Sequence, residues 1–258
     1  MSEPTKYAPG TPSWVDIGTD VDAAKQFYGS LFGWGSQDAG PPEQTGGYGF
    51  FTKRAQLVAG YGPQQNPGPP FWSTYVSVAD ADATTKKVES AGGTVVMAPM
   101  DVMTAGRMAV FQDPQGAFIS IWQPGEHQGA QLVNEPGTMC WNELNTRDVE
   151  GSKKFYGEVF GWQPVTHQDG PMPYTEFQLD GSTVCGMLEM PPMVPSDVPP
   201  HWLVYFAVDD TDASASTAQG LGASVLMPAM DIPVGRFAVV ADPQGAAFGV
   251  IRLSQQPG

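Results

Sequence analysis

The sequence predicts an α+β protein built from two tandem domains, each of them a pair of βαβββ modules. Three observations support this fold class. Segments of the first half recur in the second half in the same order, strand-like alternation and helix-like spacing follow one another in each copy, and the many glycines and prolines fall between apolar runs. With 258 residues, the chain is long enough for one or two domains with apolar cores.

The internal repeat defines the domain organisation. The offset between the copies is nearly constant, so the copies differ only by short insertions in loops. The matching segments are Lys25–Trp34 with Lys153–Trp162, Pro70–Trp72 with Pro200–Trp202, and Gly106–Gly116 with Gly235–Gly245. We therefore predict a first domain over residues 1–122, a linker over 123–138 and a second domain over 139–258.

The elements follow one another in the same order in each module. Residues 14–18 alternate like a strand, and residues 20–31 have apolar side chains at helical spacing, with Asp20 as the N-cap and Gly33 at the end. In the first half we further expect strands at 48–51, 56–61, 73–78, 94–97, 108–112 and 117–122, a helix at 80–91, and a turn at Asp113–Gly116. Residues 139–190 and 202–252 repeat this plan.

Composition and charge exclude several classes of function. The net charge is −15 with only 12 lysines and arginines, so we expect no nucleic-acid partner and no anionic membrane surface. No signal-like apolar segment or membrane-length apolar run occurs, which predicts a cytoplasmic protein. The two cysteines, Cys140 and Cys185, have apolar neighbours and are predicted to be buried free thiols.

The order of elements resembles the vicinal oxygen chelate superfamily, which includes glyoxalase I, bleomycin-resistance proteins and extradiol dioxygenases. The residues that carry the resemblance are Asp20, Phe27-Tyr28, Gly33-Trp34 and Asp113–Gly116, with their counterparts Asp148, Phe155-Tyr156, Gly161-Trp162 and Asp242–Gly245. Asn134–Gly137 and Trp141–Leu144 look like a two-domain actinobacterial subgroup of glyoxalase-like antigens. The resemblance implies that the modules pair into an incomplete barrel, with helices outside and a ligand on the concave side.

The resemblance also implies where metal-using members place a His, Gln or Glu on inward strand faces. The matching positions here hold Ser13, Ser73, Ser120, Trp141, Leu203 and Gly249. None of these is a usual imidazole or carboxylate ligand, so we expect no metal and no other cofactor. A non-standard site made of Glu143, Glu189 and His201 in the second domain is the alternative. Otherwise Glu143 is a hydrogen-bond acceptor, and His201 packs near the start of a strand.

Strand alternation sorts side chains onto the two faces of each predicted sheet. Val15, Ile17, Val76, Val78, Ile119 and Ile121 are expected to face outward, under the helices. Inward-facing aromatic and polar residues form the predicted ligand-binding set: Trp14, Asp16, Tyr75 and Trp122 in the first domain, and Trp141, Glu143, Asn145 and Tyr205 in the second. The alternative is that these aromatic residues only fill the barrel.

Asp16 and Glu143 are the candidate catalytic residues, because a buried carboxyl group needs a partner or a ligand and can become a base. Arg107 and Arg236 are candidate partners for them, or else residues that bind backbone carbonyls at turns. His127, in the linker, is interpreted as structural. The methionines Met97, Met100, Met103 and Met108, with Met227 and Met230, are predicted to pack between the domains.

These features predict metal-independent binding or sequestration of a small aromatic or carbonyl compound, similar to bleomycin-resistance proteins. The alternative is a glyoxalase-like lyase or isomerase acting on an α-ketoaldehyde adduct, with Glu143 as base. A third hypothesis is an interaction protein whose pockets have lost their function. We expect a small-molecule ligand as the partner and a monomer with two pseudo-symmetric domains.

Overall fold

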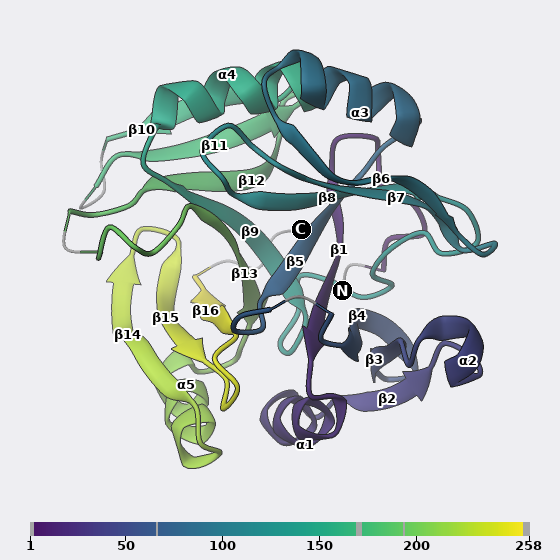
Figure 1. Cartoon of the computed structure of the whole chain (residues 1–258). Helices are drawn as coiled ribbons and strands as arrows, with labels where there is room; N and C mark the ends of the chain where they lie inside the picture. The colour runs from purple at the N-terminus through teal and green to yellow at the C-terminus, as the bar shows by residue number, and fades with distance from the viewer. Residues whose placement is uncertain (1–2, 66, 169–171, 193, 255–258) are drawn as a thin grey trace.

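Two mixed sheets form the protein, one from each half of the chain (Figure 1). The computed structural model describes residues 3–65, 67–168, 172–192 and 194–254. In the first half the elements are β1 (Pro12–Thr19), α1 (Val21–Phe32), β2 (Gly35–Asp38), α2 (Pro42–Thr45), β3 (Gly49–Lys53), β4 (Gln56–Pro63), β5 (Trp72–Ser77), α3 (Ala81–Ser90), β6 (Thr94–Val102), β7 (Gly106–Gln112) and β8 (Phe118–Pro124).

The second half repeats this order without a counterpart of α2 in its described residues. Its elements are β9 (Met139–Thr146), α4 (Val149–Phe160), β10 (Gln163–His167), β11 (Tyr174–Leu179), β12 (Ser182–Glu189), β13 (His201–Ala207), α5 (Thr211–Gly220), β14 (Ser224–Ile232), β15 (Gly235–Ala241) and β16 (Ala247–Leu253). The tandem α+β organisation is thus confirmed. The short strand β2 and helix α2 were not predicted, because β2 reads Gly-Ser-Gln-Asp and is fully exposed.

The helices begin and end where the sequence predicted. The Asp20 carboxylate accepts a hydrogen bond from the backbone N–H of Ala23, and Gly33 ends α1 in the left-handed conformation. Asp148 and Gly161 do the same for α4. The repeat therefore preserves both caps of these helices.

Within each sheet the two modules join edge to edge. In the first sheet the order is β2-β3-β4-β1-β5-β8-β7-β6, and β1 runs antiparallel to β5 with Asp16 opposite Ser73. The second sheet has the matching order β10-β11-β12-β9-β13-β16-β15-β14. Each sheet curls but leaves its end strands unpaired, as expected for an incomplete barrel.

The two sheets pack back to back, with their helices filling the space between them at the two ends. In Figure 1, α1 lies beside α5 and α3 lies beside α4, so each helix pair combines the two halves. At the centre β5 lies against β13, where Thr74 Oγ1 donates a hydrogen bond to Asn142 Oδ1 at 2.9 Å. The inner face of each curled sheet therefore points away from the other half.

Both large hydrophobic clusters draw residues from both halves. The first contains Tyr28, Phe32, Trp34 and Phe51 together with Val204, Phe206, Phe248 and Val250. The second contains Val76, Phe111 and Ile119 together with Phe155, Tyr156, Trp162 and Phe177. Among the described residues, only a small third cluster, around Leu203, Tyr205 and Ile251, lies within one half. The sequence repeat and the two large hydrophobic cores therefore divide the chain differently.

The motifs that revealed the repeat are the ones that join the halves. Tyr28, on α1, donates a hydrogen bond to Asp242 Oδ2 of the opposite half at 2.9 Å, and Trp72 Nε1 donates to the Tyr28 hydroxyl at 3.0 Å. In the pseudo-symmetric copy, Tyr156 donates to Asp113 Oδ2 at 2.9 Å. The tyrosines of the Phe-Tyr motif and the aspartates of the two turns are therefore interface residues.

The predicted sorting of side chains onto the outer face is confirmed. All six residues of that layer are buried, with exposed fractions of 5% or less: Val15, Ile17, Val76, Val78, Ile119 and Ile121. They pack under helices from their own half and from the other half.

The prediction for the methionines was wrong for five of the six, whereas Met108 is half-buried and packs against the first cluster, which both halves share. Met97, Met100, Met103, Met227 and Met230 are 36–59% exposed and do not pack between the domains. The reason is their position: four of them lie on β6 and β14, the end strands of the two sheets, which are mostly exposed.

Two further predictions concern the thiols and the membrane. Cys140 and Cys185 are free, with Cys185 buried and Cys140 half-buried. In the part of the chain that the structure describes, no helix has both the length and the apolar character needed to cross a bilayer.

Candidate binding sites on the inner faces

Strand register identifies the side chains that share the inner face of each sheet, the face turned away from the shared cores. Paired residues on neighbouring strands point to the same side. In the first sheet one such row is Met97, Val110, Ser120, Tyr75 and Trp14, read from β6 to β1. The matching row of the second sheet is Met227, Val239, Gly249, Tyr205 and Trp141. Both rows place predicted site residues on the inner face.

Asp16 is the centre of a hydrogen-bonded group on the first inner face. Its Oδ2 accepts one hydrogen bond from the Tyr48 hydroxyl and one from the Tyr75 hydroxyl, each at 2.9 Å. Trp14 Nε1 donates to the Tyr48 oxygen at 3.1 Å. Burial raises the pKa of Asp16 to about 6, although hydrogen bonds from Tyr75, Tyr48 and Ser73 partly oppose the rise. We call Asp16, Tyr48 and Tyr75 the first acid centre.

Glu143 takes the same place on the second inner face. The Tyr205 hydroxyl donates to Oε1 at 3.0 Å and the Tyr174 hydroxyl donates to Oε2 at 2.9 Å. Trp141 Nε1 donates to the Tyr174 oxygen at 2.8 Å, and the Asn145 amide lies 3.5 Å from Glu143 Oε1. Burial again raises the pKa of the carboxyl group. We call Glu143, Tyr174 and Tyr205 the second acid centre.

Sequence reasoning missed Tyr48 and Tyr174, which reach their acids across the sheet. Each tyrosine lies over a glycine of the neighbouring strand, Gly60 or Gly186, where an added Cβ would overlap the phenol oxygen. The absence of a side chain at these glycines is what lets the tyrosine approach the carboxyl group. Tyr48 and Gly60 recur in the second half at one common offset, and this repeat was the available signal.

The arginines proposed as partners of the acids do not reach them. Arg107 pairs with Asp82 and Asp101, both at 2.9 Å, and Arg236 makes the equivalent pairs with Asp212 and Asp231. These contacts lie at the exposed end of each sheet. The interpretation of the arginines as carbonyl-binding turn residues is also wrong, since both bind carboxylates. Phenol hydroxyls, not cations, therefore partner the buried acids.

Trp122, the remaining predicted residue, packs against the linker. Its Nε1 donates to the backbone oxygen of His127 at 2.8 Å. The His127 ring lies among Trp14, Phe50 and Trp122, with ring centroids 4.5 Å from Trp14 and 5.7 Å from each of the other two. Among the described residues His127 Nε2 has no hydrogen-bond partner, and burial lowers the pKa of His127 to about 4. The imidazole is therefore neutral at pH 7.

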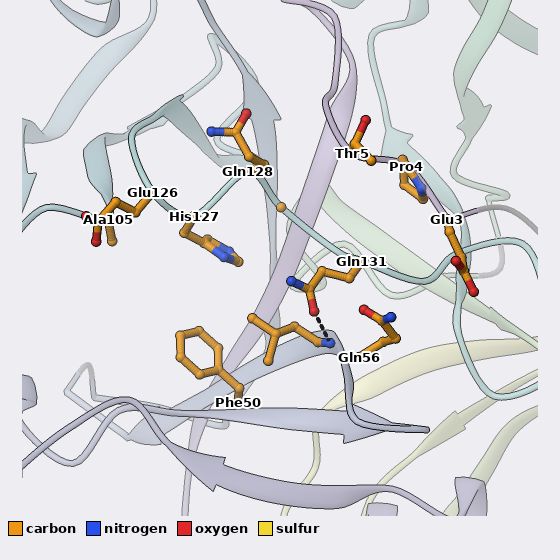
Figure 2. Close-up of a pocket in the computed structure, with 12 residues that line it drawn as sticks. Glu3, Pro4, Thr5, Phe50, Gln56, Ala105, Glu126, His127, Gln128 and Gln131 are labelled. Atoms are coloured by element: carbon orange, nitrogen blue, oxygen red, sulfur yellow. Dashed lines mark hydrogen bonds between the residues drawn. The ribbon is translucent and has the colours of Figure 1, made fainter.

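A cavity of about 530 Å³ borders His127, between the linker and the β3–β4 hairpin (Figure 2). Phe50 and His127 border it, whereas the residues of the first acid centre do not. The rings of His127 and Trp14 thus stand between the cavity and Asp16.

The side chains on the inner faces do not fit the metal of metal-using relatives. Ser73 and Ser120 of the first sheet, and Leu203 and Gly249 of the second, supply no carboxylate or imidazole. The acids that do lie on the inner faces are already engaged by tyrosines. Asp16 Oδ2 accepts hydrogen bonds from two tyrosine hydroxyls, and each oxygen of Glu143 accepts one. Within the described ranges no three residues of the types His, Cys, Asp and Glu come together in a way that could hold a metal ion.

The alternative metal site in the second domain is not assembled. Glu189 is exposed, and His201 Nδ1 lies 2.9 Å from the backbone oxygen of Pro199. Glu143 is engaged by its two tyrosines. The absence of a bound metal or cofactor stays a prediction, which rests on the donor chemistry of the inner faces.

The fold agrees with the comparison to known families. The chain belongs to the Glyoxalase/Bleomycin resistance protein/Dioxygenase superfamily, whose family model matches residues 17–121 and again residues 138–250. Both halves are therefore copies of the domain that defines the family.

Similar proteins occur in Mycobacterium and Streptomyces species. The chain is 44% identical to "Putative glyoxylase CFP32" of Mycobacterium tuberculosis, over 99% of this chain and 100% of that protein. It is 39% identical to "Anthracycline biosynthesis protein DnrV" of Streptomyces peucetius, over 97% of this chain and 96% of that protein.

Solved structures share the fold at low sequence identity. The Mn(II)-bound glyoxalase from Novosphingobium aromaticivorans matches with a TM-score of 0.64 and 16% identity, over 96% of this chain and 83% of that one. The 2,3-dioxygenase LapB from Pseudomonas sp. KL28 matches with a TM-score of 0.64 and 14% identity, over 96% and 93% of the two chains.

Proposed function

We propose that the protein binds or sequesters a small aromatic or carbonyl-bearing compound on the inner face of a sheet, without a metal. The observation that carries the proposal is the acid centre, a buried carboxyl group held between two tyrosine hydroxyls and beside a tryptophan. The same group occurs in both halves although the surrounding side chains differ. Such a group offers acceptor oxygens to a ligand in an otherwise apolar surrounding, and its carboxyl group becomes a donor when it is protonated.

The rest of the inner face supports an aromatic ligand. Exposed methionines of β6 and β14 extend the aromatic surface toward solvent, and thioether side chains adapt to flat apolar molecules. The name of the Streptomyces peucetius relative assigns that protein to the biosynthesis of anthracyclines, which are polycyclic aromatic compounds. A ligand of this type would stack on Trp14 or Trp141 and exchange hydrogen bonds with the acid centre.

A ligand screen combined with metal analysis tests the proposal. Purified protein should contain less than stoichiometric zinc, nickel, iron or manganese. Polycyclic aromatic ketones and phenols should raise its melting temperature, because a ligand present at 100 times its Kd adds about 2.7 kcal/mol of stability. Whichever of Asp16→Asn and Glu143→Gln reduces this rise in melting temperature identifies the inner face that binds the ligand. Stoichiometric metal, or no stabilisation by any member of the panel, would contradict the proposal.

The second candidate function is a glyoxalase-like lyase or isomerase acting on an α-ketoaldehyde adduct. Two observations favour it: the name of the mycobacterial relative and the burial that raises the pKa of Glu143. A raised pKa would let Glu143 accept a proton from carbon and return it. Glu143→Gln should then abolish turnover of the methylglyoxal–thiol adduct while Asp16→Asn retains it. Equal activity of both variants would exclude Glu143 as the base.

We further propose that the protein acts as a monomer in the cytoplasm. Back-to-back packing already joins the two halves within one chain, so no second copy is needed to cover the outer faces of the sheets. Light scattering after gel filtration should give a mass near 27.5 kDa, whereas a mass twice as large would contradict the proposal.

A further inference from the structure

The cavity of about 530 Å³ beside His127 is separate from the two acid centres. Its wall comes from four parts of the chain: residues 3–5, the β3–β4 region with Phe50, Gln56 and Leu57, Ala105 in the turn after β6, and residues 126–129 and 131 of the linker. Figure 2 shows His127, Phe50 and Gln131 pointing toward the same space. Its volume lies within the range of small-molecule sites, roughly 300–1,000 Å³. The function proposed above does not use this cavity.

Hydrogen bonds hold the linker side of the cavity in place. Gln131 exchanges two bonds with Leu57: its backbone N–H donates to the Leu57 oxygen at 2.8 Å, and its Oε1 accepts from the Leu57 N–H at 2.9 Å (Figure 2). The N–H of Ala130 donates to Ser13 at 2.8 Å, and the N–H of His127 donates to Ala105 at 3.0 Å. The linker is thus a fixed wall of the first domain, and a preformed wall lowers the entropic cost of binding.

The chemistry of the wall selects the charge of an occupant. Phe50 and Leu57 give it an apolar side, and Gln56, Gln128 and Gln131 contribute carboxamides. Glu3 and Glu126 contribute carboxylates, while the described lining residues include no lysine or arginine. The whole chain carries a net charge of −15. An anion would therefore be repelled from this cavity, and a cation would be attracted to it.

We propose that this cavity is a binding site for a small aromatic cation. The ring system would lie against Phe50 and the His127 imidazole, where aromatic stacking and cation–π attraction act together. The positive group would lie near Glu126, whose Oε2 accepts a hydrogen bond from Thr104 at 2.6 Å and is thereby oriented. The glutamine amides would supply the remaining polar contacts.

The second half does not repeat this site. The register position of Phe50 is taken by Glu176, and that of Trp122 is taken by Ile251. We therefore expect one such site per chain, beside the linker.

Titration with proflavine, a planar aromatic cation, tests the proposal, with 2-naphthalenesulfonate as a matched aromatic anion. The fluorescence of Trp14 and Trp122, whose rings contact His127, reports on the cavity. We expect one proflavine per full-length chain, bound at least about tenfold more tightly than the sulfonate, because the acidic wall attracts the cation and repels the anion; tenfold corresponds to about 1.4 kcal/mol. No saturable proflavine binding, or equal affinity for both probes, would overturn the proposal.

Three substitutions in the wall of the cavity, at Glu126, Phe50 and Gln128, and one control at Glu158 locate the binding. Glu126→Gln should weaken proflavine binding about fivefold, whereas Glu158→Gln, which removes an exposed carboxylate on α4, should change it less than about twofold. Phe50→Ala should weaken it about tenfold, and Gln128→Ala provides a substitution on the linker if Phe50→Ala fails to fold. Equal effects of Glu126→Gln and Glu158→Gln, or no effect at Phe50 and Gln128, would overturn the proposal.

Asp16→Asn separates this inference from the proposed function. It should leave proflavine binding within about twofold of wild type, because Asp16 does not line the cavity. Loss of proflavine binding in this variant would place the probe at the acid centre and overturn the assignment.

Discussion

The two inner faces share a hydrogen-bonded framework but differ in the side chains around it. Both halves have the same tryptophan, the same two tyrosines, and the same glycine beside Tyr48 or Tyr174. The acid is Asp16 in the first half and Glu143 in the second. In contrast, the inner-face residues Ser73, Ser120 and Trp122 become Leu203, Gly249 and Ile251 in the second half.

This difference separates what the fold needs from what a ligand would contact. The tyrosine–aspartate pairs that join the halves occur in both copies, so losing either pair would weaken the packing of one half against the other. The side chains that differ lie on the inner faces, outside these joining hydrogen bonds. The two faces are therefore expected to bind different molecules, or only one of them is expected to bind.

The largest expected effect tests whether the halves depend on each other. Asp242→Ala removes the acceptor of Tyr28 and of two backbone N–H groups in the turn, so it should destabilise the protein by about 3 kcal/mol or more. Asp113→Ala removes the matching contacts and should cost about the same. Urea unfolding followed by circular dichroism should remain a single transition in both variants. Two separate transitions would show that the halves fold independently.

The second prediction uses pH to compare two buried groups of the first half. His127 has a pKa lowered to about 4 by burial, so only the unfolded state takes up its proton as the pH falls from 6.5 to 4, and stability falls. Asp16 has a pKa raised to about 6 by burial, so the folded state takes up a proton first as the pH falls from 6 to 3.8, and stability rises. Each contribution amounts to roughly 3 kcal/mol.

The two contributions oppose each other in wild type and should separate in variants. Relative to wild type, His127→Gln should become more stable as the pH falls from 6.5 to 4, and Asp16→Asn should become less stable over 6 to 3.8. Urea midpoints measured across this range give both slopes. Parallel curves for the two variants would contradict the buried positions of these groups.

A smaller effect tests the glycines that make room for the tyrosines. Gly60→Ala would push the Tyr48 hydroxyl away from Asp16, and Gly186→Ala would do the same to Tyr174 and Glu143, each at a cost of about 2 kcal/mol. In a Tyr48→Phe background the Gly60→Ala cost should fall by about 1 kcal/mol, because the overlapping oxygen is gone. Chemical denaturation of the four proteins gives this coupling, and strict additivity would show that Gly60 serves another purpose.

The smallest effect concerns the end strands of the two sheets. Met100→Ala and Met230→Ala should each change stability by less than about 0.5 kcal/mol, because both side chains are more than a third exposed. If either substitution lowers the free energy of unfolding by more than about 1 kcal/mol in thermal unfolding, that methionine is packed against other residues.

Strand periodicity was sufficient to predict which side chains share a face. Because successive side chains of a strand alternate, Trp14, Asp16 and Tyr75 could be assigned together. In the structure Tyr75 donates directly to Asp16, and Tyr48 links Trp14 to Asp16. The helix caps followed from single residues such as Asp20 and Gly33. These inferences depend on local geometry, which the sequence specifies directly.

What the sequence could not specify were contacts between distant parts of the chain. An apolar outer face must be covered, but alternation does not reveal that Val76 lies under a helix of the other half. The hydrogen bond from Tyr48 to Asp16 depends on Gly60 in another strand. The contact between the linker and the inner face depends on His127, whose ring packs against Trp14. The error over the methionines has the same origin, since exposure at the end of a sheet depends on what covers it.

The exchange of core contacts between the halves has a consequence for cutting the chain. A fragment ending in the linker would present α1 and α3 without the surfaces that bury Tyr28 and Val76. Such a fragment should associate with a copy of itself or with the complementary fragment, because association buries the exposed apolar surface. We therefore expect two separately expressed halves to fold only when they are mixed, which would make the polypeptide usable as a split reporter.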